Sequence, residues 1–293
     1  MPTLLLGTAN WGWKTDRSTA HALLSAWYEA GFREVDTATN YPINKIPADF
    51  RKAEKILTEW IKTHGVKDLK ITAKVGSINN MRSPDHLLAK SFLLMCLDEY
   101  QLLWDTNLDT LMVHWDNRDS RLRQGYGGGT RETLEALAYA KEQGIRPGLS
   151  GIKHPEVYAE VNKDFGLEFR IQCKHHVLES GYDHYKPFHG TKRFVAYGIN
   201  ARGAKLGKEP KLDFLKPILE KVNRDKNRPP IEHFYQVGLL YAYHHPDMEG
   251  ILIGPSSVAQ LEHNLTFFQY LKGWDYSDIN ELLNRKDAKD AKK

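Results

Sequence analysis

The chain has 293 residues, of which 41% are hydrophobic and 27% charged, so wholesale disorder is excluded. No apolar run approaches the ~18–20 residues that cross a bilayer, and no basic residue precedes the short apolar run at the start of the chain. A membrane span and a signal peptide are therefore not expected. The two cysteines cannot build a disulfide framework, which makes the cytoplasm the expected location.

The net charge of +4 is unevenly distributed along the chain. Residues 285–293 hold five basic and two acidic residues, so three of the four net charges lie in this tail. The nearly neutral body argues against a nucleic-acid partner. Residues 281–293 are expected to form a disordered, solvated tail.

Short β-rich segments alternate with helical patterns along the chain. The segments predicted to be strands are 3–6, 33–36, 70–75, 109–113, 145–149, 169–172, 193–197 and 250–253. The helices are predicted, in chain order, over 17–30 and 50–63, from Ser83-Pro84 onward, from Thr130 to Gly144, from His154-Pro155 onward, and over 212–223, 230–244 and 256–271.

Eight strands alternating with helices predict a single (β/α)8 barrel over residues 1–280. A doubly wound open sheet is the alternative. That fold would place a glycine-rich phosphate loop after the first strand, where residues 6–10 offer only Gly7. The barrel is therefore favoured.

In a barrel of this kind the active site lies where the strands end. Polar residues end the predicted strands at Asp36, Lys74, His114, Ser150, Gln172 and Tyr197, and Tyr41 follows Asp36 by five residues. A lysine beside a tyrosine would lower the phenol's pKa from near ~10, and a carboxylate would hold the lysine charged. A histidine could orient a carbonyl oxygen, so the set suits proton transfer. No close pair of ligands points to a metal site.

These residues stand in segments that resemble the aldo-keto reductase family. The family pattern DTAxxY is present at residues 36–41, its lysine stands in the segment 71–76, and its histidine stands in the segment 111–116. The resemblance extends from residue 6 to about residue 265. It implies that Tyr41 is the general acid in carbonyl reduction, that Lys74 lowers its pKa, that Asp36 pairs with Lys74, and that His114 orients the substrate carbonyl.

The same resemblance implies a nicotinamide cofactor and residues that hold it. Gln172 would hold the carboxamide, Tyr197 would stack on the ring, and residues 203–208 would cover the pyrophosphate, with Lys208 as the charge contact. A helix is predicted to begin near residue 256, and the free amides and positive dipole at its start would suit a phosphate group there. The full set of positions implied to contact the cofactor is Ser150, Gln172, Tyr197, Gly198, Lys208, Gly254, Ser256, Ser257, Gln260, His263 and Asn264.

Three positions depart from the family pattern. Ser150-Gly151 stands where many relatives have Ser-Asn, Ser257 stands near a common basic residue, and His263 replaces an expected glutamate. These changes weaken the preference for NADP(H), which most of the family uses, so NADP(H) is only slightly favoured and NAD(H) is the alternative. Ser257 and Gln260 also fit a helix capping box, which needs no ligand.

Other features leave the substrate open. Trp11 and Trp115 follow two strands and are candidates for the substrate pocket, with packing as the alternative. The glycine-rich segment 125–129 is expected to be a loop over the active site, and Arg118, Arg121 and Arg123 near it are expected to be solvated. The partner is expected to be a small carbonyl compound or sugar, and the oligomeric state is not predicted. A cofactor-binding protein with slow turnover, like a channel subunit, is the alternative function.

Overall fold

The computed structural model describes residues 1–81, 85–118, 129–225 and 227–284. Eight parallel strands form a closed barrel in the order β1-β2-β3-β4-β5-β6-β8-β9, with β9 returning to pair with β1. The predicted (β/α)8 barrel is confirmed, and the open sheet is wrong because β5 also pairs with β6. The barrel strands are β1 (Thr3–Gly7), β2 (Glu34–Ala38), β3 (Lys70–Val75), β4 (Leu108–His114), β5 (Arg146–Ser150), β6 (Arg170–His176), β8 (Phe194–Tyr197) and β9 (Met248–Ile253).

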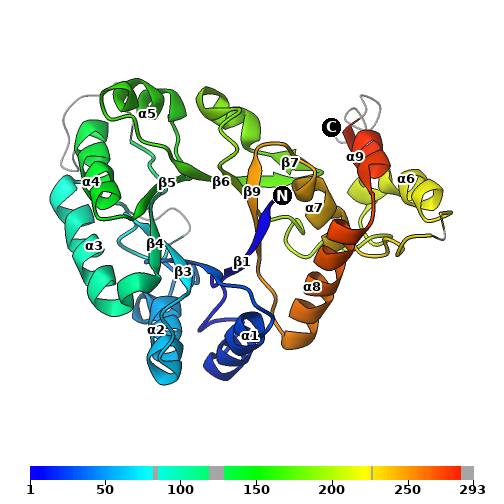
Figure 1. Cartoon of the computed structure of the whole chain (residues 1–293), viewed down its shortest axis with the longest axis horizontal. Helices are drawn as coiled ribbons and strands as arrows, with labels where there is room; N and C mark the ends of the chain where they lie inside the picture. The colour runs from blue at the N-terminus through cyan, green and yellow to red at the C-terminus, as the bar shows by residue number, and fades with distance from the viewer. Residues whose placement is uncertain (82–84, 119–128, 226, 285–293) are drawn as a thin grey trace.

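Helices surround the barrel, with α1 to α5 following one another around one side and α6 to α9 gathered on the other (Figure 1). They form where apolar residues recur at helical spacing. In α1 the residues Ala20, Leu23, Leu24 and Trp27 are buried, and the Asp16 side chain caps the first turn. The helices are α1 (Arg17–Glu29), α2 (Lys52–His64), α3 (Lys90–Trp104), α4 (Thr130–Glu142), α5 (Pro155–Val161), α6 (Leu215–Val222), α7 (Phe234–Tyr243), α8 (Val258–Gly273) and α9 (Ser277–Asn284).

Short elements fill several of the connections. The strand β7 (Glu179–Ser180) folds back antiparallel onto β6, and the 3₁₀ helix η4 (Tyr182–Phe188) follows it before β8. The remaining 3₁₀ helices of the described residues are η1 (Pro47–Asp49), η2 (Asp105–Asn107), η3 (Asn162–Asp164) and η5 (Pro210–Leu212).

Two predicted boundaries differ from the structure. The third helix begins at Lys90 rather than at Ser83-Pro84: residues 82–84 lie outside the described residues, and residues 85–89 are not helical. There the backbone N–H of Leu87 donates to the Gly76 oxygen at 2.7 Å, which ties this segment back to the end of β3. The expected boundary at residue 280 falls inside α9, and residues 285–293 lie outside the described residues.

The barrel interior contains two layers of polar side chains. In the lower layer the Arg170 guanidinium contacts the carboxylates of Glu34 at 2.5 Å and Glu249 at 2.7 Å. Two residues further along β2 and β6, Asp36 and Gln172 face each other in the upper layer. Side chains two residues apart on a strand point to the same face, so one register positions both layers.

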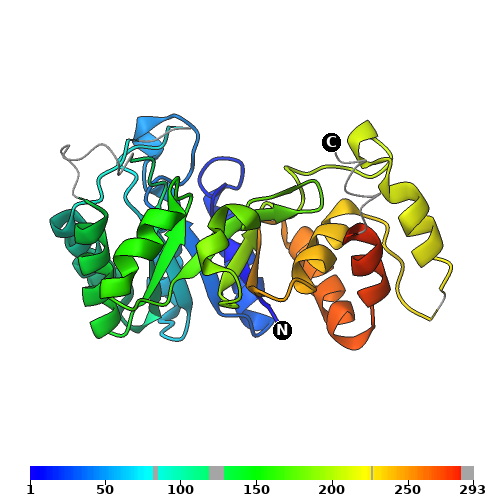
Figure 2. The ribbon, with the colours of Figure 1, turned by 90° about the horizontal axis from the view of Figure 1, so that it is seen from above.

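The loops that leave the carboxyl ends of the strands gather at one end of the barrel. In Figure 2 the dark blue loop after β1 lies at the upper edge, opposite the N terminus. The upper polar layer lies toward this end, because the polypeptide of every barrel strand runs in the same direction. Among the described residues, no helix is long and apolar enough to cross a membrane.

Candidate active site

Four side chains predicted to act together come from three neighbouring strands and one loop. Asp36 lies on β2, Lys74 on β3 and His114 at the end of β4, and they are 0%, 2% and 3% exposed. Tyr41 is 9% exposed and lies in the loop after β2, where its backbone N–H donates to the Ala38 oxygen at 3.1 Å. The parallel register of β2, β3 and β4 thus brings the four side chains to one end of the barrel.

A buried ion pair forms the centre of this group. The Lys74 ammonium donates to Asp36 Oδ1 at 2.5 Å and to Gln172 Oε1 at 3.2 Å. Gln172 Nε2 in turn donates to Asp36 Oδ2, so the amide links both charged groups. Burial alone would lower the pKa of Lys74, but the charge and hydrogen bond of Asp36, together with Tyr41, raise it above its usual value. Lys74 is therefore a permanent cation at neutral pH.

Tyr41 lies beside this cation, with its ring centroid 4.8 Å from the Lys74 ammonium. Burial raises the pKa of the Tyr41 hydroxyl above 10.0, the charge of Lys74 lowers it, and the charge of Asp36 raises it again. The net direction is upward, although Lys74 lowers this pKa as expected. Lys74 acts in the expected sense, but removing the phenol from water has the larger effect. Tyr41 is consequently a neutral proton donor.

His114 completes the group as a neutral imidazole. Its ring meets the Tyr41 ring edge to face, with centroids 6.0 Å apart and an angle of 87°. Burial, and then the charge of Lys74, lower the pKa of His114 well below 6.5. A neutral imidazole keeps one N–H donor and can offer it to a carbonyl oxygen.

Buried polar atoms without hydrogen-bond partners occur in the loops and strand ends beside this group. Within the described residues these are the amide of Asn40, the hydroxyl of Ser77 and Nδ1 of His114. Buried polar groups are normally paired with protein or water. The site thus has unused hydrogen-bond donors and acceptors for a polar ligand, as a nicotinamide and a carbonyl substrate would require.

Sequence analysis overlooked the residues that close the loop behind Tyr41. The backbone N–H of Arg51 donates to the Thr39 oxygen at 3.1 Å, and that of Ala53 donates to the Tyr41 oxygen at 3.3 Å. Asn80, in the loop after β3, donates to the backbone oxygens of Pro42 and Ile46 at 3.3 and 2.7 Å. Asn80 stands beside Asn79 in a polar loop segment, and no spacing pattern in the sequence marks it.

The two candidate pocket tryptophans differ in their surroundings. Trp11 is 1% exposed, belongs to the hydrophobic core and has an indole nitrogen that makes no hydrogen bond with the described residues. Trp115 is half-buried, and its ring lies 5.4 Å from the His114 ring, centroid to centroid. Trp115 is therefore the one placed beside the proton-transfer group.

The residues implied to hold the nicotinamide lie at the ends of β5, β6 and β8. Ser150 is buried beside His114 in the strand register, Gln172 is committed to the ion pair, and Tyr197 and Gly198 are half-buried. Burial raises the pKa of Tyr197 to about 12. Tyr197 thus stays neutral, which suits a ring that would stack on another ring.

Candidate contacts for the rest of the cofactor lie on exposed segments. Lys208 is exposed and makes no ion pair with the described residues. At the start of α8, Gln260 Oε1 accepts from the backbone N–H and the hydroxyl of Ser256 at 3.0 and 2.9 Å. The backbone N–H of Gln260 donates to the Ser257 hydroxyl at 3.3 Å. Ser257 thus caps the helix as the capping box alternative expects, but the Gln260 side chain accepts from Ser256 and not from the backbone N–H of the N-cap residue Ser257. Gly254 and His263 are exposed, and Asn264 donates to the Gln260 oxygen at 2.6 Å.

Other sequence features find structural explanations. Arg118 is not simply solvated, because its side chain pairs with Asp116 at 2.7 Å. Arg121, Arg123 and most of the segment 125–129 lie outside the described residues. No group of three or more His, Cys, Asp and Glu side chains in the described ranges is arranged to hold a metal ion.

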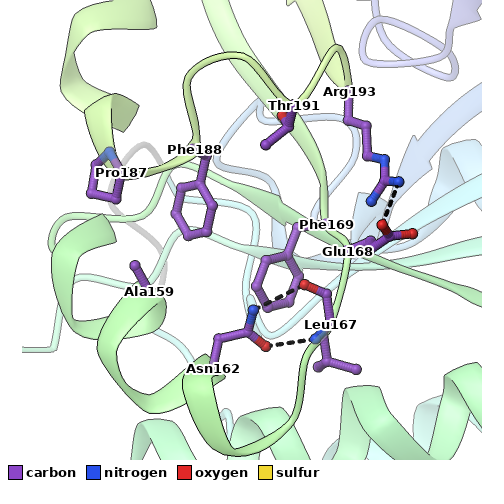
Figure 3. Close-up of a pocket in the computed structure, with 9 residues that line it drawn as sticks. All are labelled: Ala159, Asn162, Leu167, Glu168, Phe169, Pro187, Phe188, Thr191 and Arg193. Carbon is purple, nitrogen blue, oxygen red and sulfur yellow. Dashed lines mark hydrogen bonds and ion pairs between the residues drawn. The ribbon is translucent and has the colours of Figure 1, made fainter.

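A separate cavity of about 370 Å³ lies among the segments that lead into β6 and β8 (Figure 3). It is lined by Phe169, Phe188 and Arg193, among others, and Phe169 and Arg193 directly precede β6 and β8. Its charged side chains and its amide are paired with neighbours: Arg193 binds Glu168 at 2.7 Å, and Asn162 binds the Leu167 backbone. It therefore belongs to a different part of the molecule from the proton-transfer group.

Comparison with known families agrees with this geometry. The family model described as Aldo/keto reductase family matches residues 3–284. The chain belongs to the aldo/keto reductase family. This family carries out NAD(P)H-dependent oxidation and reduction at carbonyl carbons, so the chain is an oxidoreductase. A search of curated proteins found no match to it.

Proposed function

We propose that this aldo/keto reductase reduces an aldehyde or ketone to an alcohol with Tyr41 as the proton donor. The observation that carries the proposal is a neutral tyrosine whose ring lies 4.8 Å from a lysine cation that is itself held by a buried carboxylate. A proton donor and a fixed positive charge at one point are what a carbonyl oxygen needs as it gains electrons.

The residues divide the work as follows. The chemistry that a reduced nicotinamide cofactor would supply here, when bound, is hydride transfer to the carbonyl carbon. Tyr41 gives its hydroxyl proton to the carbonyl oxygen, which completes the alcohol, and the ammonium of Lys74 stabilises the phenolate that remains until solvent reprotonates it. His114 donates an N–H hydrogen bond to the same oxygen and orients it. Asp36 and Gln172 hold Lys74 in place.

We assign the cofactor contacts to Ser150, Tyr197 and Gly198 near the nicotinamide and to Lys208 and the start of α8 near the phosphates. The backbone N–H groups of Val258 and Ala259 stand in the first turn of α8 and make no hydrogen bond with the described residues. Free amides at the start of a 16-residue helix favour a phosphate group. NADPH is favoured slightly over NADH, because the aldo/keto reductase family typically uses NADPH.

We further propose a small carbonyl compound or sugar as substrate and the cytoplasm as location. Both cysteines are free and buried, as a reducing compartment allows.

A calorimetric titration of the purified protein with NADPH, and another with NADH, test the proposal. We expect saturable binding of at least one, tighter for NADPH, and consumption of the reduced cofactor when a simple aldehyde such as 4-nitrobenzaldehyde is added. Binding of neither cofactor would overturn the proposed function. Binding without turnover of any aldehyde, ketone or sugar would favour the slow cofactor-binding alternative.

A further inference from the structure

The backbone at the end of β4 holds Trp115 in an unusual conformation. Trp115 has a φ of +64°, a region that residues with side chains adopt at a cost. Its backbone N–H donates to the Ser150 oxygen at 2.8 Å, which ties it to the end of β5. The next residue, Asp116, accepts from the Tyr158 hydroxyl at 2.7 Å, and its backbone oxygen accepts from the Lys153 N–H at 2.9 Å. The conformation is thus fixed from both sides.

Gly151 makes the space that the Trp115 indole occupies. A Cβ atom built on Gly151 would lie 2.5 Å from Cδ1 and 3.2 Å from Nε1 of Trp115. Gly151 also has a φ of +66°, so a side chain there is unfavourable twice over. The indole and a side chain at position 151 therefore exclude each other. Where many relatives are expected to carry an asparagine, this chain has an indole N–H.

The indole N–H is an uncommitted donor at this place. No hydrogen bond joins it to the described residues, and Trp115 is only half-buried. Gln172, the nearby amide in the register, already donates through Nε2 to Asp36 and accepts through Oε1 from Lys74. A ligand group that reaches the ends of β5 and β6 thus finds the Trp115 N–H available beside the one N–H that Gln172 does not use for Asp36.

We infer that Trp115 Nε1–H donates a hydrogen bond to the carboxamide oxygen of the nicotinamide, and that Gly151 is required because it admits the indole. This inference rests on the proposed function, since it assigns a contact to the cofactor. In the proposed function, Tyr41 and His114 serve the substrate carbonyl. Trp115 is therefore a cofactor-orienting residue.

The test compares a whole cofactor with one that lacks the nicotinamide. The binding of NADPH and of 2′-phospho-ADP-ribose is measured by calorimetry for the wild type, Trp115→Phe and Gly151→Ala. Phenylalanine keeps an aromatic ring and removes the N–H, whereas alanine displaces the indole. Trp13→Phe, at the half-exposed tryptophan of the loop after β1, is the matched control.

We expect both active-site variants to bind NADPH about 3- to 10-fold more weakly, as the loss of one hydrogen bond would cause. Binding of 2′-phospho-ADP-ribose should stay within error of the wild type for every variant, and Trp13→Phe should change neither ligand. Equal NADPH binding by Trp115→Phe and the wild type would overturn the inference and leave the proposed function standing. Failure of the wild type itself to bind NADPH or NADH would instead overturn the proposed function, and this inference with it.

Discussion

Removing either member of the buried pair Asp36–Lys74 should be costly, whereas removing both should not. The two side chains are 1% and 3% exposed, and among the residues that the structure describes only Gln172 shares hydrogen bonds with both. Lys74→Met leaves a buried carboxylate without its cation, and Asp36→Asn leaves a buried ammonium without its anion. Breaking a buried pair in this way costs about 3–5 kcal/mol, while neutralising both partners is often close to neutral.

Urea unfolding followed by tryptophan fluorescence measures these costs for the two single variants and for Asp36→Asn/Lys74→Met. We expect each single variant to lose about 3–5 kcal/mol of unfolding free energy and the double variant to lose less than either one. All three variants should lack carbonyl reduction. Additive losses in the double variant would refute the reasoning, because they would show that the two charges do not stabilise each other.

Three further predictions concern pH, the cofactor and the loop behind Tyr41. For carbonyl reduction, kcat/KM should be flat from about pH 7 to 9, since the pKa of His114 lies below 6.5 and that of Tyr41 above 10.0. As pH rises through the pKa of Tyr41, kcat/KM for carbonyl reduction should fall and kcat/KM for alcohol oxidation should rise. A bell-shaped profile centred near pH 7 would contradict both pKa shifts. Lys208→Ala should weaken NADPH binding by about 3- to 10-fold at low salt and less at high salt, as calorimetry at two salt concentrations would show; a loss that does not depend on salt would argue against a charge contact. Glu54→Gln should destabilise the fold by about 1–3 kcal/mol in urea unfolding, because the Glu54 carboxylate is buried and binds Arg51 Nε at 2.6 Å; an unchanged midpoint would refute this.

The barrel was predictable because the spacing of apolar residues along the sequence differs between its strands and its helices. Strand segments such as 70–75 are apolar on alternate residues or throughout, and the helix over 17–29 places Ala20, Leu23, Leu24 and Trp27 on one face. The start of α3 was not predictable, because Ser83-Pro84 has the composition of a helix start, yet residues 85–89 are held against β3 by backbone hydrogen bonds. Tertiary contacts there outweigh local preference.

The proton-transfer group was predictable because Asp36, Lys74 and His114 lie on three successive predicted strands and Tyr41 lies in the loop after the first of these. Its electrostatics were not, since the pKa of Tyr41 depends on how completely the phenol is buried, and spacing says nothing about burial. The hydrogen bonds of Gln172 to Asp36 and Lys74 likewise depend on how β6 and β2 face each other across the barrel, and no local sequence pattern predicts this. Gly151 stood out only as a departure from the family pattern, and its role emerges from the position of the Trp115 ring.

The central claim is that the Tyr41 hydroxyl supplies the proton in carbonyl reduction. It is tested most directly by comparing NADPH oxidation by the wild type and Tyr41→Phe at saturating 4-nitrobenzaldehyde, with NADPH binding measured on the same preparations. The account predicts that phenylalanine lowers kcat by a factor of about 10² to 10⁴ and leaves the Kd for NADPH nearly unchanged. Turnover by Tyr41→Phe at the wild-type rate would contradict it.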